Sequence, residues 1–501
     1  MRKGRNTMLP ALAVGLGIVL MTGCGGAGGG SSSTTTTPVV TEPPGSLVTF
    51  GTDAPICDVQ SFVVTMTSAS LIPSGSGSPV PVISTAPATV DFGRLTDFTT
   101  ILGTASVAPG TYSQLQMTLT SPQLTVLNTS TSPPTPQPVT ASFSNNSTTE
   151  TLTVDISPAL TISSNSTTGV MMDFNLRKSL QVDANGQVTG TVDPMFTLTP
   201  ATVSGTTVGE ADSLYGIVQS VNTTTPPSGF TGSFTLAVHD GVGQTLTILA
   251  NSSTDFEGDG VTGLSNLQPN TFVEVDAIVN TSGQIIAQEV DAEEQVSAAS
   301  QKSAFLGKII SITRDESSGN ATSFTLIVDD EIPDLSGEIP LHSGLNVTLS
   351  SSTTYFTNWH HWNREAFTLN PKTLGVAELV AVHGVLGSGS NPAMAAHQVF
   401  LRPRNVLGNF THLLAAGSDG KTGGFNLVPC GALFGGNPIT VLTFADTNFN
   451  GVSGLVGLTP APTLNTYGVL FYEQSSGTAN GASWTAPTWV MQAKGVHQLP
   501  N

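Results

Sequence analysis

The segments that decide the fold are three apolar pentapeptides with a central glycine: Leu214-Tyr215-Gly216-Ile217-Val218, Phe305-Leu306-Gly307-Lys308-Ile309 and Val406-Leu407-Gly408-Asn409-Phe410. The three glycines stand at nearly equal intervals along the chain. A Phe-x-Leu segment follows each glycine at almost the same offset, and these segments begin at Phe234, Phe324 and Phe425. Agreement of this kind is hard to obtain by chance, so the sequence predicts three copies of one β unit.

Three further elements recur in each unit, namely a Thr-x-Phe segment, a strand and a closing strand. The Thr-x-Phe segments are Thr254-Asp255-Phe256, Thr354-Tyr355-Phe356 and Thr447-Asn448-Phe449. The strands that follow are 272–276, 379–383 and the weaker 467–471, and the closing strands are 287–290, 396–400 and 489–493. Five or so antiparallel strands of this length close most simply as a small barrel, similar in shape to the oligonucleotide/oligosaccharide-binding (OB) class.

The first two units resemble domain of unknown function 5666. They match its pattern of Gly-x-Val, Phe-x-Leu-x-Val, Thr-x-Phe and a glycine-ended β-hairpin, and the third unit is a degenerate copy. We place the units at residues 213–294, 304–403 and 404–501. Separate barrels of this size need not stack, so beads on a string is the expected arrangement.

The stretch before the repeats, residues 46–202, contains short alternating segments such as 47–50, 62–66 and 112–119, separated by turn residues. Asn185-Gly186 is a good hairpin signal. The spacing predicts a sandwich of two antiparallel sheets. The fold class is therefore all-β, with an antiparallel β-sandwich followed by two or three small β-barrels.

This stretch resembles domain of unknown function 4382. The resemblance is carried by Thr52-Asp53-Ala54-Pro55, Thr89-Val90-Asp91-Phe92, Pro109-Gly110-Thr111-Tyr112, and Met172-Asp173-Phe174-Asn175 with Ser179-Leu180. The family is found in predicted envelope lipoproteins and has no established activity. Asn175 stands where the family pattern usually has a second aspartate. We expect Asp53 and Asp91 to cap turns by accepting backbone N–H groups, and Tyr112 to pack rather than react.

The N-terminus resembles a bacterial lipoprotein signal. A basic start and an apolar run, 8–20, lead to Leu20-Met21-Thr22-Gly23-Cys24, which resembles a lipobox. This predicts a removed signal peptide (1–23), lipidation of Cys24, and membrane attachment through that lipid. Residues 24–45, rich in Gly, Ser, Thr and Pro, are expected to be a flexible tether. Gly25 and Gly26 lack the aspartate that retains lipoproteins at the inner membrane, so we expect an outer-membrane or cell-surface location.

Composition narrows the classes of partner and chemistry. The net charge of −19 makes nucleic acid an unsuitable partner. No motif for a cofactor, a calcium loop or nucleophilic catalysis is found, so we expect no cofactor and no enzyme activity. Of three cysteines, Cys57 and Cys430 remain after Cys24. An envelope compartment permits a disulfide between them, but their wide separation favours two buried free thiols in different domains.

The octapeptide 358–365 in the second unit concentrates aromatic and histidine residues: Trp359, His360, His361 and Trp362. Rings on a loop beside a barrel often hold sugars or extended ligands, so these four residues form the candidate ligand-binding site. The favoured alternative is a loop that packs its tryptophans onto a neighbouring domain. Adjacent histidines on a strand point to opposite faces, which makes them a poor chelating pair.

His383 and His397 flank a predicted hairpin whose turn lies near 387–391. Pairing around position 390 would place them across from each other, but no third metal ligand is evident, so a solvated or core-edge pair is favoured. The function predicted from the sequence is a lipid-anchored, non-catalytic binding or structural module for a polysaccharide or an envelope protein. The alternative is a metal-binding protein or metal-dependent enzyme that uses the region from His360 to His397.

Overall fold

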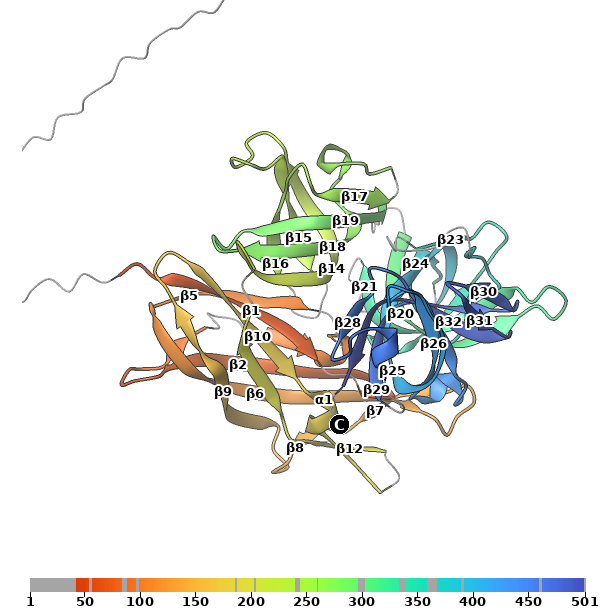
Figure 1. Ribbon diagram of the computed structural model, residues 1–501, viewed down its shortest axis with the longest axis horizontal. Helices are drawn as coiled ribbons and strands as arrows, with labels where there is room; N and C mark the ends of the chain where they lie inside the picture. Colours follow the sequence, from red (N-terminus) through yellow and green to blue (C-terminus); the bar gives the residue numbers. More distant parts are fainter. Residues whose placement is uncertain are drawn as a thin grey trace, which may run out of the picture. The chain divides into compact units, whose positions relative to one another are not determined.

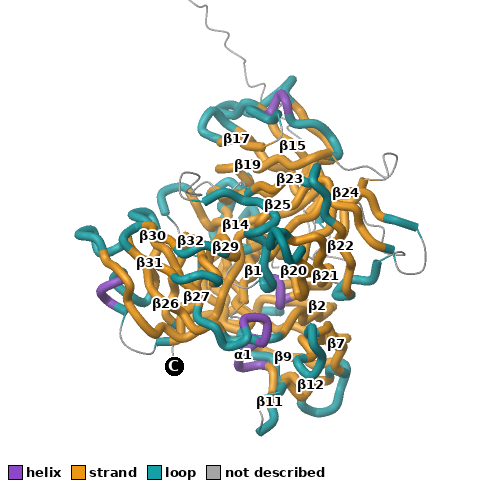
Figure 2. Tube along the Cα trace, turned by 90° about the vertical axis from the view of Figure 1, so that its right-hand side faces the viewer, coloured by secondary structure: helices purple, strands orange, loops and turns teal. Residues whose placement is uncertain are grey.

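The computed structural model describes residues 42–53, 56–82, 88–95, 99–184, 187–201, 204–238, 244–258, 260–295, 302–332, 339–357, 367–388, 392–458 and 462–499. Strands dominate these residues and the helical segments are single turns, as Figure 2 shows. The predicted all-β class is confirmed. In the described part of the chain, no helix has the length and apolarity needed to cross a membrane.

The N-terminal module, which we call the sandwich, comprises β1 to β13. Its main sheet has the order β3-β2-β6-β9-β13-β10-β1-β5, with β4 on β2 and β7 on β6, and a small sheet has the order β11-β12-β8. Phe62 and Phe174 stack in its core with ring centroids 5.3 Å apart. The elements are β1 (Gly45–Asp53), β2 (Val59–Pro73), β3 (Val80–Pro81), β4 (Ala88–Asp91), η1 (Phe92–Arg94), β5 (Thr100–Val107), β6 (Gly110–Asn128), β7 (Thr135–Val139), β8 (Ser142–Phe143), β9 (Thr149–Ile162), β10 (Thr167–Phe174), α1 (Leu176–Ser179), β11 (Leu180–Val182), β12 (Val188–Val192) and β13 (Phe196–Pro200).

The sandwich is not wholly antiparallel, which corrects the sequence-based expectation. β1 runs parallel to β10, from the pair Ser46↔Thr167 to the pair Asp53↔Phe174. Parallel neighbours need a long crossover, and here all of β2 to β9 lies between the two strands in sequence. β1 is also buried on both faces: Leu47 enters the sandwich core, whereas Phe50 packs with the core of the first barrel.

Three barrels follow, drawn in green to blue in Figure 1, and the pairing of their strands gives each the same strand order. Repeat 1 has the order β16-β15-β14-β18-β19, repeat 2 β22-β21-β20-β24-β25 and repeat 3 β27-β26-β25-β29-β32. In each, the first and last strands pair in parallel and close the barrel. The third unit, degenerate in sequence, is thus a full barrel. The elements are β14 (Thr207–Asn222), β15 (Gly232–Val238), β16 (Thr245–Ala250), β17 (Asp255–Gly258), η2 (Leu264–Asn266), β18 (Thr271–Asn280), β19 (Ile285–Gln295), β20 (Lys302–Arg314), β21 (Ala321–Ile332), β22 (Gly344–Thr348), β23 (Thr354–Phe356), β24 (Leu379–Leu386), β25 (Ala393–Ala416), β26 (Gly423–Pro429), η4 (Ala432–Phe434), β27 (Ile439–Thr443), β28 (Asn448–Asn450), η5 (Leu455–Gly457), β29 (Thr463–Glu473), β30 (Gly477–Ala479), β31 (Ala482–Trp484) and β32 (Thr488–Gln498).

The repeat glycines are required by close approach of the neighbouring strand. A Cβ added at Gly216, Gly307 or Gly408 would meet a backbone carbonyl oxygen closer than real Cβ atoms come to any atom. In each barrel a β-bulge follows shortly after the glycine. A glycine in a strand interior commonly marks such a close approach, which explains why this residue recurs when the rest of the repeat varies.

One threonine has the same role in all three barrels. The Oγ1 atoms of Thr254, Thr353 and Thr447 donate to the carbonyl oxygens of the closing strands at 2.9, 2.8 and 2.8 Å. The equivalent residue in repeat 2 is therefore Thr353 and not Thr354. Consequently Tyr355, rather than Phe356, packs against the barrel core where the other repeats have phenylalanine.

Repeats 2 and 3 are joined without a linker. The single strand β25 pairs with β24 through its first half and with β26 and β29 through its second half. One apolar core contains residues of both barrels, such as Val380 and Phe471. Residues Glu42–Asn501 form one compact unit. The beads-on-a-string expectation is therefore wrong for these two repeats.

Candidate functional site

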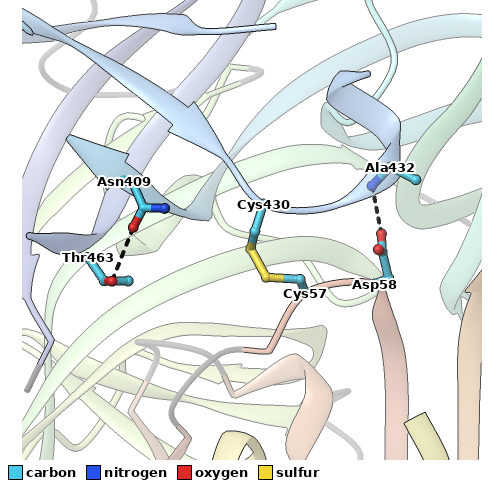
Figure 3. The surroundings of a disulfide bond; sticks show 6 residues. All are labelled: Cys57, Asp58, Asn409, Cys430, Ala432 and Thr463. Atoms are coloured by element: carbon cyan, nitrogen blue, oxygen red, sulfur yellow. Dashed lines mark hydrogen bonds between the residues drawn. A yellow bond between two sulfur atoms is a disulfide. The ribbon is translucent and has the colours of Figure 1, made fainter. Parts of the chain in front are cut away.

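A disulfide joins the sandwich to repeat 3. Cys57 lies in the turn before β2, Cys430 follows β26, and their Cα atoms are 5.7 Å apart although 373 positions separate them (Figure 3). Beside this bond, Asp58 Oδ1 accepts a hydrogen bond from the backbone N–H of Ala432 at 2.9 Å. The expectation of two free thiols is thus wrong. Their wide separation in sequence does not prevent a disulfide, because both cysteines lie at edges of modules that meet in the fold.

A cavity of about 170 Å³ lies beside the disulfide. Residues from the sandwich and from all three repeats line it, so no single module contains it. Leu306, Leu379 and Leu433 belong to its apolar wall. Its charged and amide side chains are Asp58, Gln60, Arg94, Lys308, Asp329, Arg404 and Asn405.

Lys308 brings a positive charge into this cavity from β20. It directly follows the repeat glycine Gly307, at the place where the other repeats have Ile217 and Asn409. Its Nζ atom donates to Oε1 of Gln60 at 3.3 Å. Burial lowers the pKa of the Lys308 ammonium, and Asp329 is the charged neighbour that most opposes this shift.

Asp329, on β21, is the counterpart of Lys308. Its side chain is 5% exposed, and its Oδ1 atom has no hydrogen-bond partner among the described residues. Burial raises the pKa of Asp329, while Lys308 lowers it. A buried carboxylate oxygen without a donor is uncommon in folded proteins.

Arg404 supplies a second cation from β25. Its Nε atom donates to the carbonyl oxygen of Asn405 at 3.1 Å, and its guanidinium lies 6.0 Å from the ring centroid of Phe434. Burial lowers the pKa of Arg404 to about 10, so the side chain keeps its charge at neutral pH. Arg94 is already paired, because its Nη2 atom lies 3.2 Å from Asp330 Oδ2.

A second buried polar cluster joins repeats 1 and 2. Arg402 Nη1 lies 2.5 Å from Glu274 Oε2, and its Nη2 forms an ion pair with Glu293. His383 Nε2 lies 2.5 Å from Glu293 Oε2. The Arg402 guanidinium also lies over the ring of Tyr215, with its Cζ atom 5.3 Å from the ring centroid. Arg402 contacts both glutamates and His383 contacts Glu293, an arrangement that suits a structural junction.

The predicted facing of His383 and His397 is wrong. The hairpin exists, but His383 pairs with Gln398, and a bulge between His383 and Gly384 leaves His397 without a cross-strand partner in the ladder. His383 is 1% exposed, whereas His397 is exposed to solvent. One extra residue moves a side chain to the other face of a strand, so the two rings do not converge.

The other sequence candidates divide into two groups. Cys24 and the four residues of the aromatic loop, Trp359, His360, His361 and Trp362, lie outside the described residues. Asp91 and Tyr112 have the structural roles that the sequence predicts, whereas Asp53, among the described residues, accepts from a distant backbone N–H and not from its own turn. Asp53 Oδ1 accepts from Leu176 N at 3.0 Å, Asp91 Oδ1 accepts from Gly93 N at 3.1 Å, and Tyr112 is buried with its hydroxyl on Ala108 O at 2.8 Å. Across the described ranges, no group of three or more His, Cys, Asp and Glu side chains is arranged to hold a metal ion.

Comparison with known proteins identifies both β families in the predicted order. The model of "Domain of unknown function (DUF4382)" matches residues 45–189, and that of "Domain of unknown function (DUF5666)" matches residues 215–291. No curated protein matches the chain. A solved structure titled "drosophila Unr CSD456" is 9% identical, with 58% of this chain and 98% of that chain covered, at a TM-score of 0.14. Similarity at that TM-score carries no argument about this protein.

Proposed function

We propose that this protein is a lipid-anchored, non-catalytic module of the bacterial envelope that presents its β domains to a polysaccharide or protein partner at the outer membrane or cell surface. The observation that best supports an extracytoplasmic location is the Cys57–Cys430 disulfide. Such bonds form and persist in oxidising compartments and are rare in the cytosol. The predicted lipidation of Cys24 and the tether after it agree with that location.

The contacts between modules favour a rigid array over domains that close on a substrate. The disulfide and the Asp58–Ala432 hydrogen bond tie repeat 3 to the sandwich, and the Arg94–Asp330 ion pair ties repeat 2 to it. The buried cluster around Arg402 joins repeats 1 and 2. The ion pairs at the other two junctions resist separation, because breaking one leaves its partner uncompensated.

Anchoring and orientation are tested in cells. We expect an alkyne-bearing fatty acid to label the wild-type protein and not the Cys24→Ser variant; absence of label in the wild type would remove the anchor from the proposal. Protease added to intact cells should digest the repeats if they face outward. Protection until lysis would place them in the periplasm and favour an envelope protein as partner.

The aromatic loop is the proposed contact with that partner. Trp359→Ala with Trp362→Ala should weaken binding to envelope polysaccharide, because flat rings stack on the apolar faces of sugars. Phe356→Ala is the matched control, since Phe356 is 40% exposed and precedes the loop. Unchanged affinity in the double variant would show that the loop is not the site.

The alternative is a metal function in the region from His360 to His397. Its test is metal analysis of protein purified without a histidine tag. One bound metal per chain would favour this alternative over the binding module, whereas substoichiometric metal would remove it.

A further inference from the structure

We propose that the cavity beside the Cys57–Cys430 disulfide is a binding site for one neutral, polyhydroxylated small molecule of about the size of a monosaccharide. This inference does not rest on the proposed function. The ligand is a small molecule held between the modules.

The size of the cavity restricts the ligand. Its volume of about 170 Å³ is smaller than the pockets that hold drug-sized molecules. It offers room for about six water molecules at their liquid volume, and a pentose, a hexose or a smaller polyol needs comparable space. An oligosaccharide would have to leave most of its residues outside.

The polar groups of the cavity are complementary to a ligand that both donates and accepts hydrogen bonds. Asp329 lines the cavity, and its Oδ1 atom is buried in the wall without a donor among the described residues, so the carboxylate must turn to present this atom to a ligand. Lys308 carries three N–H donors, and Gln60 accepts one of them. A hydroxyl group donates to a carboxylate and accepts from an ammonium at the same time. Neighbouring hydroxyls on one carbon chain can therefore serve Asp329 and Lys308 together.

Charge balance favours a neutral ligand. The cations Lys308 and Arg404 are matched by the acidic side chains of Asp58 and Asp329 on the same cavity, and Arg94 is paired with Asp330. An additional net charge at a buried site would remain uncompensated, which is costly in a region of low dielectric. This argues against phosphate or a simple carboxylate as the preferred occupant.

The remaining wall suits the carbon skeleton of such a molecule. Leu306, Leu379 and Leu433 contribute apolar surface beside the charged groups. A pyranose has hydroxyls around its rim and C–H groups on its faces, so it matches a cavity with polar groups on one side and leucines on the other. A small convergent polar set on an apolar wall is the usual composition of small-molecule sites.

The experiment measures the binding of small-molecule probes to the oxidised full-length chain by saturation-transfer NMR and calorimetric titration. The neutral probes are D-glucose, D-galactose, N-acetyl-D-glucosamine and glycerol, and the charged probes are phosphate and acetate. We expect at least one neutral probe to bind saturably. Asp329→Asn and Lys308→Met should each weaken it roughly ten- to hundredfold, the effect of losing a hydrogen bond to a charged group.

Three controls keep the test decisive. Lys494→Met removes an exposed lysine and should bind as the wild type does, and so should the alanine variants of Trp359 and Trp362, which separates this site from the aromatic loop. Leu379→Trp fills the cavity without removing any of its charged side chains and should abolish binding with the thermal unfolding midpoint retained. The proposal is overturned if no neutral probe binds, if phosphate or acetate binds more tightly, or if Leu379→Trp binds as tightly as the wild type.

Discussion

Removing the Cys57–Cys430 disulfide is the most informative single perturbation of this fold. The bond spans 373 residues. In the chain-entropy account, cross-linking a loop of that length restricts the unfolded state by about 6 kcal/mol at 25 °C. Cys57→Ser with Cys430→Ser should therefore destabilise the protein, with that figure as the upper limit.

The expected loss is smaller than the limit because the modules do not depend on the bond alone. The sandwich and repeat 3 have separate apolar cores, and the Asp58–Ala432 and Arg94–Asp330 contacts remain when the disulfide is absent. We therefore expect about 2–4 kcal/mol, the typical range for a native disulfide. We also expect repeats 2 and 3, which share one core, to separate together from the sandwich before any of these modules unfolds.

Urea unfolding measures both effects. With Trp359 and Trp362 replaced by phenylalanine, the fluorescence of Trp484 and Trp489 reports on repeat 3, and circular dichroism reports on all strands. The double variant and the reduced wild type should unfold at a midpoint lower by about 1 M urea, while Cys24→Ser should be unaffected. Equal midpoints for oxidised and reduced protein, or reactive thiols at both positions in denatured unreduced protein, would refute the reasoning.

Three other predictions concern buried charges and the repeat glycines. Burial, with Glu274 and Glu289, raises the pKa of Asp291 from 3.8 to about 8, so the folded state binds the proton more tightly and stability declines as pH rises from about 4 to about 8. Asp291→Asn should remove this decline and stabilise the protein at pH 7 by on the order of 2 kcal/mol; urea midpoints that depend on pH as strongly as in the wild type would contradict it. Arg402→Met leaves Glu274 and Glu293 buried without their cation and should lower the free energy of unfolding by about 3–5 kcal/mol. The control Lys494→Met, at the exposed pair with Asp276, should lower it by less than about 1 kcal/mol. Equal losses for the two variants in chemical denaturation would show that the cluster is not structural. Gly307→Ala places a Cβ against the carbonyl oxygen of Ile327 and should lower stability by roughly 1–3 kcal/mol. The control Gly103→Ala, in a strand with open space around this glycine, should be nearly neutral. If the two variants lose the same stability in thermal unfolding, close approach of the neighbouring strand does not explain the repeat glycines.

The repeat architecture was accessible from the sequence because its constraint acts on the backbone. Gly216, Gly307 and Gly408 each face a carbonyl oxygen that admits no side chain, so the residue type itself records the contact. The alignment of Thr354 with Thr254 and Thr447 failed for a related reason. The alignment matched Phe356 with the phenylalanines of the other repeats. The feature that all three barrels share is the hydrogen bond from a threonine hydroxyl to the closing strand, and in repeat 2 Thr353 makes it.

The third repeat shows the same limit in its later strands. The sequence places its fourth strand at 467–471, but Gly408 pairs with Leu464, as Gly216 pairs with Val273 and Gly307 with Val380. The apolar pattern of Thr463–Glu473 is continuous enough to fit several registers. Register is fixed by pairing across the barrel, which a single strand does not record.

The cavity was not predicted because its parts converge from strands that are distant in sequence. One local signal existed: Lys308 follows the repeat glycine inside an apolar strand, where repeat 1 has Ile217. A charged residue in a buried position needs a partner, and that requirement alone marks it as unusual. Nothing in the sequence around Asp329 or Arg404 identifies them as its neighbours.

The disulfide forms part of the cavity wall. Cys57 and Cys430 belong to the cavity lining, so the bond holds together the two walls that come from the sandwich and from repeat 3. Any molecule that binds only the closed junction stabilises it, and by reciprocity closing the junction strengthens binding of that molecule. A ligand of this cavity should therefore protect the disulfide from reduction, and reduction should weaken the ligand by the same factor. A factor above one identifies a site that belongs to the junction, because reduction would leave affinity unchanged for a site that belongs to a single barrel.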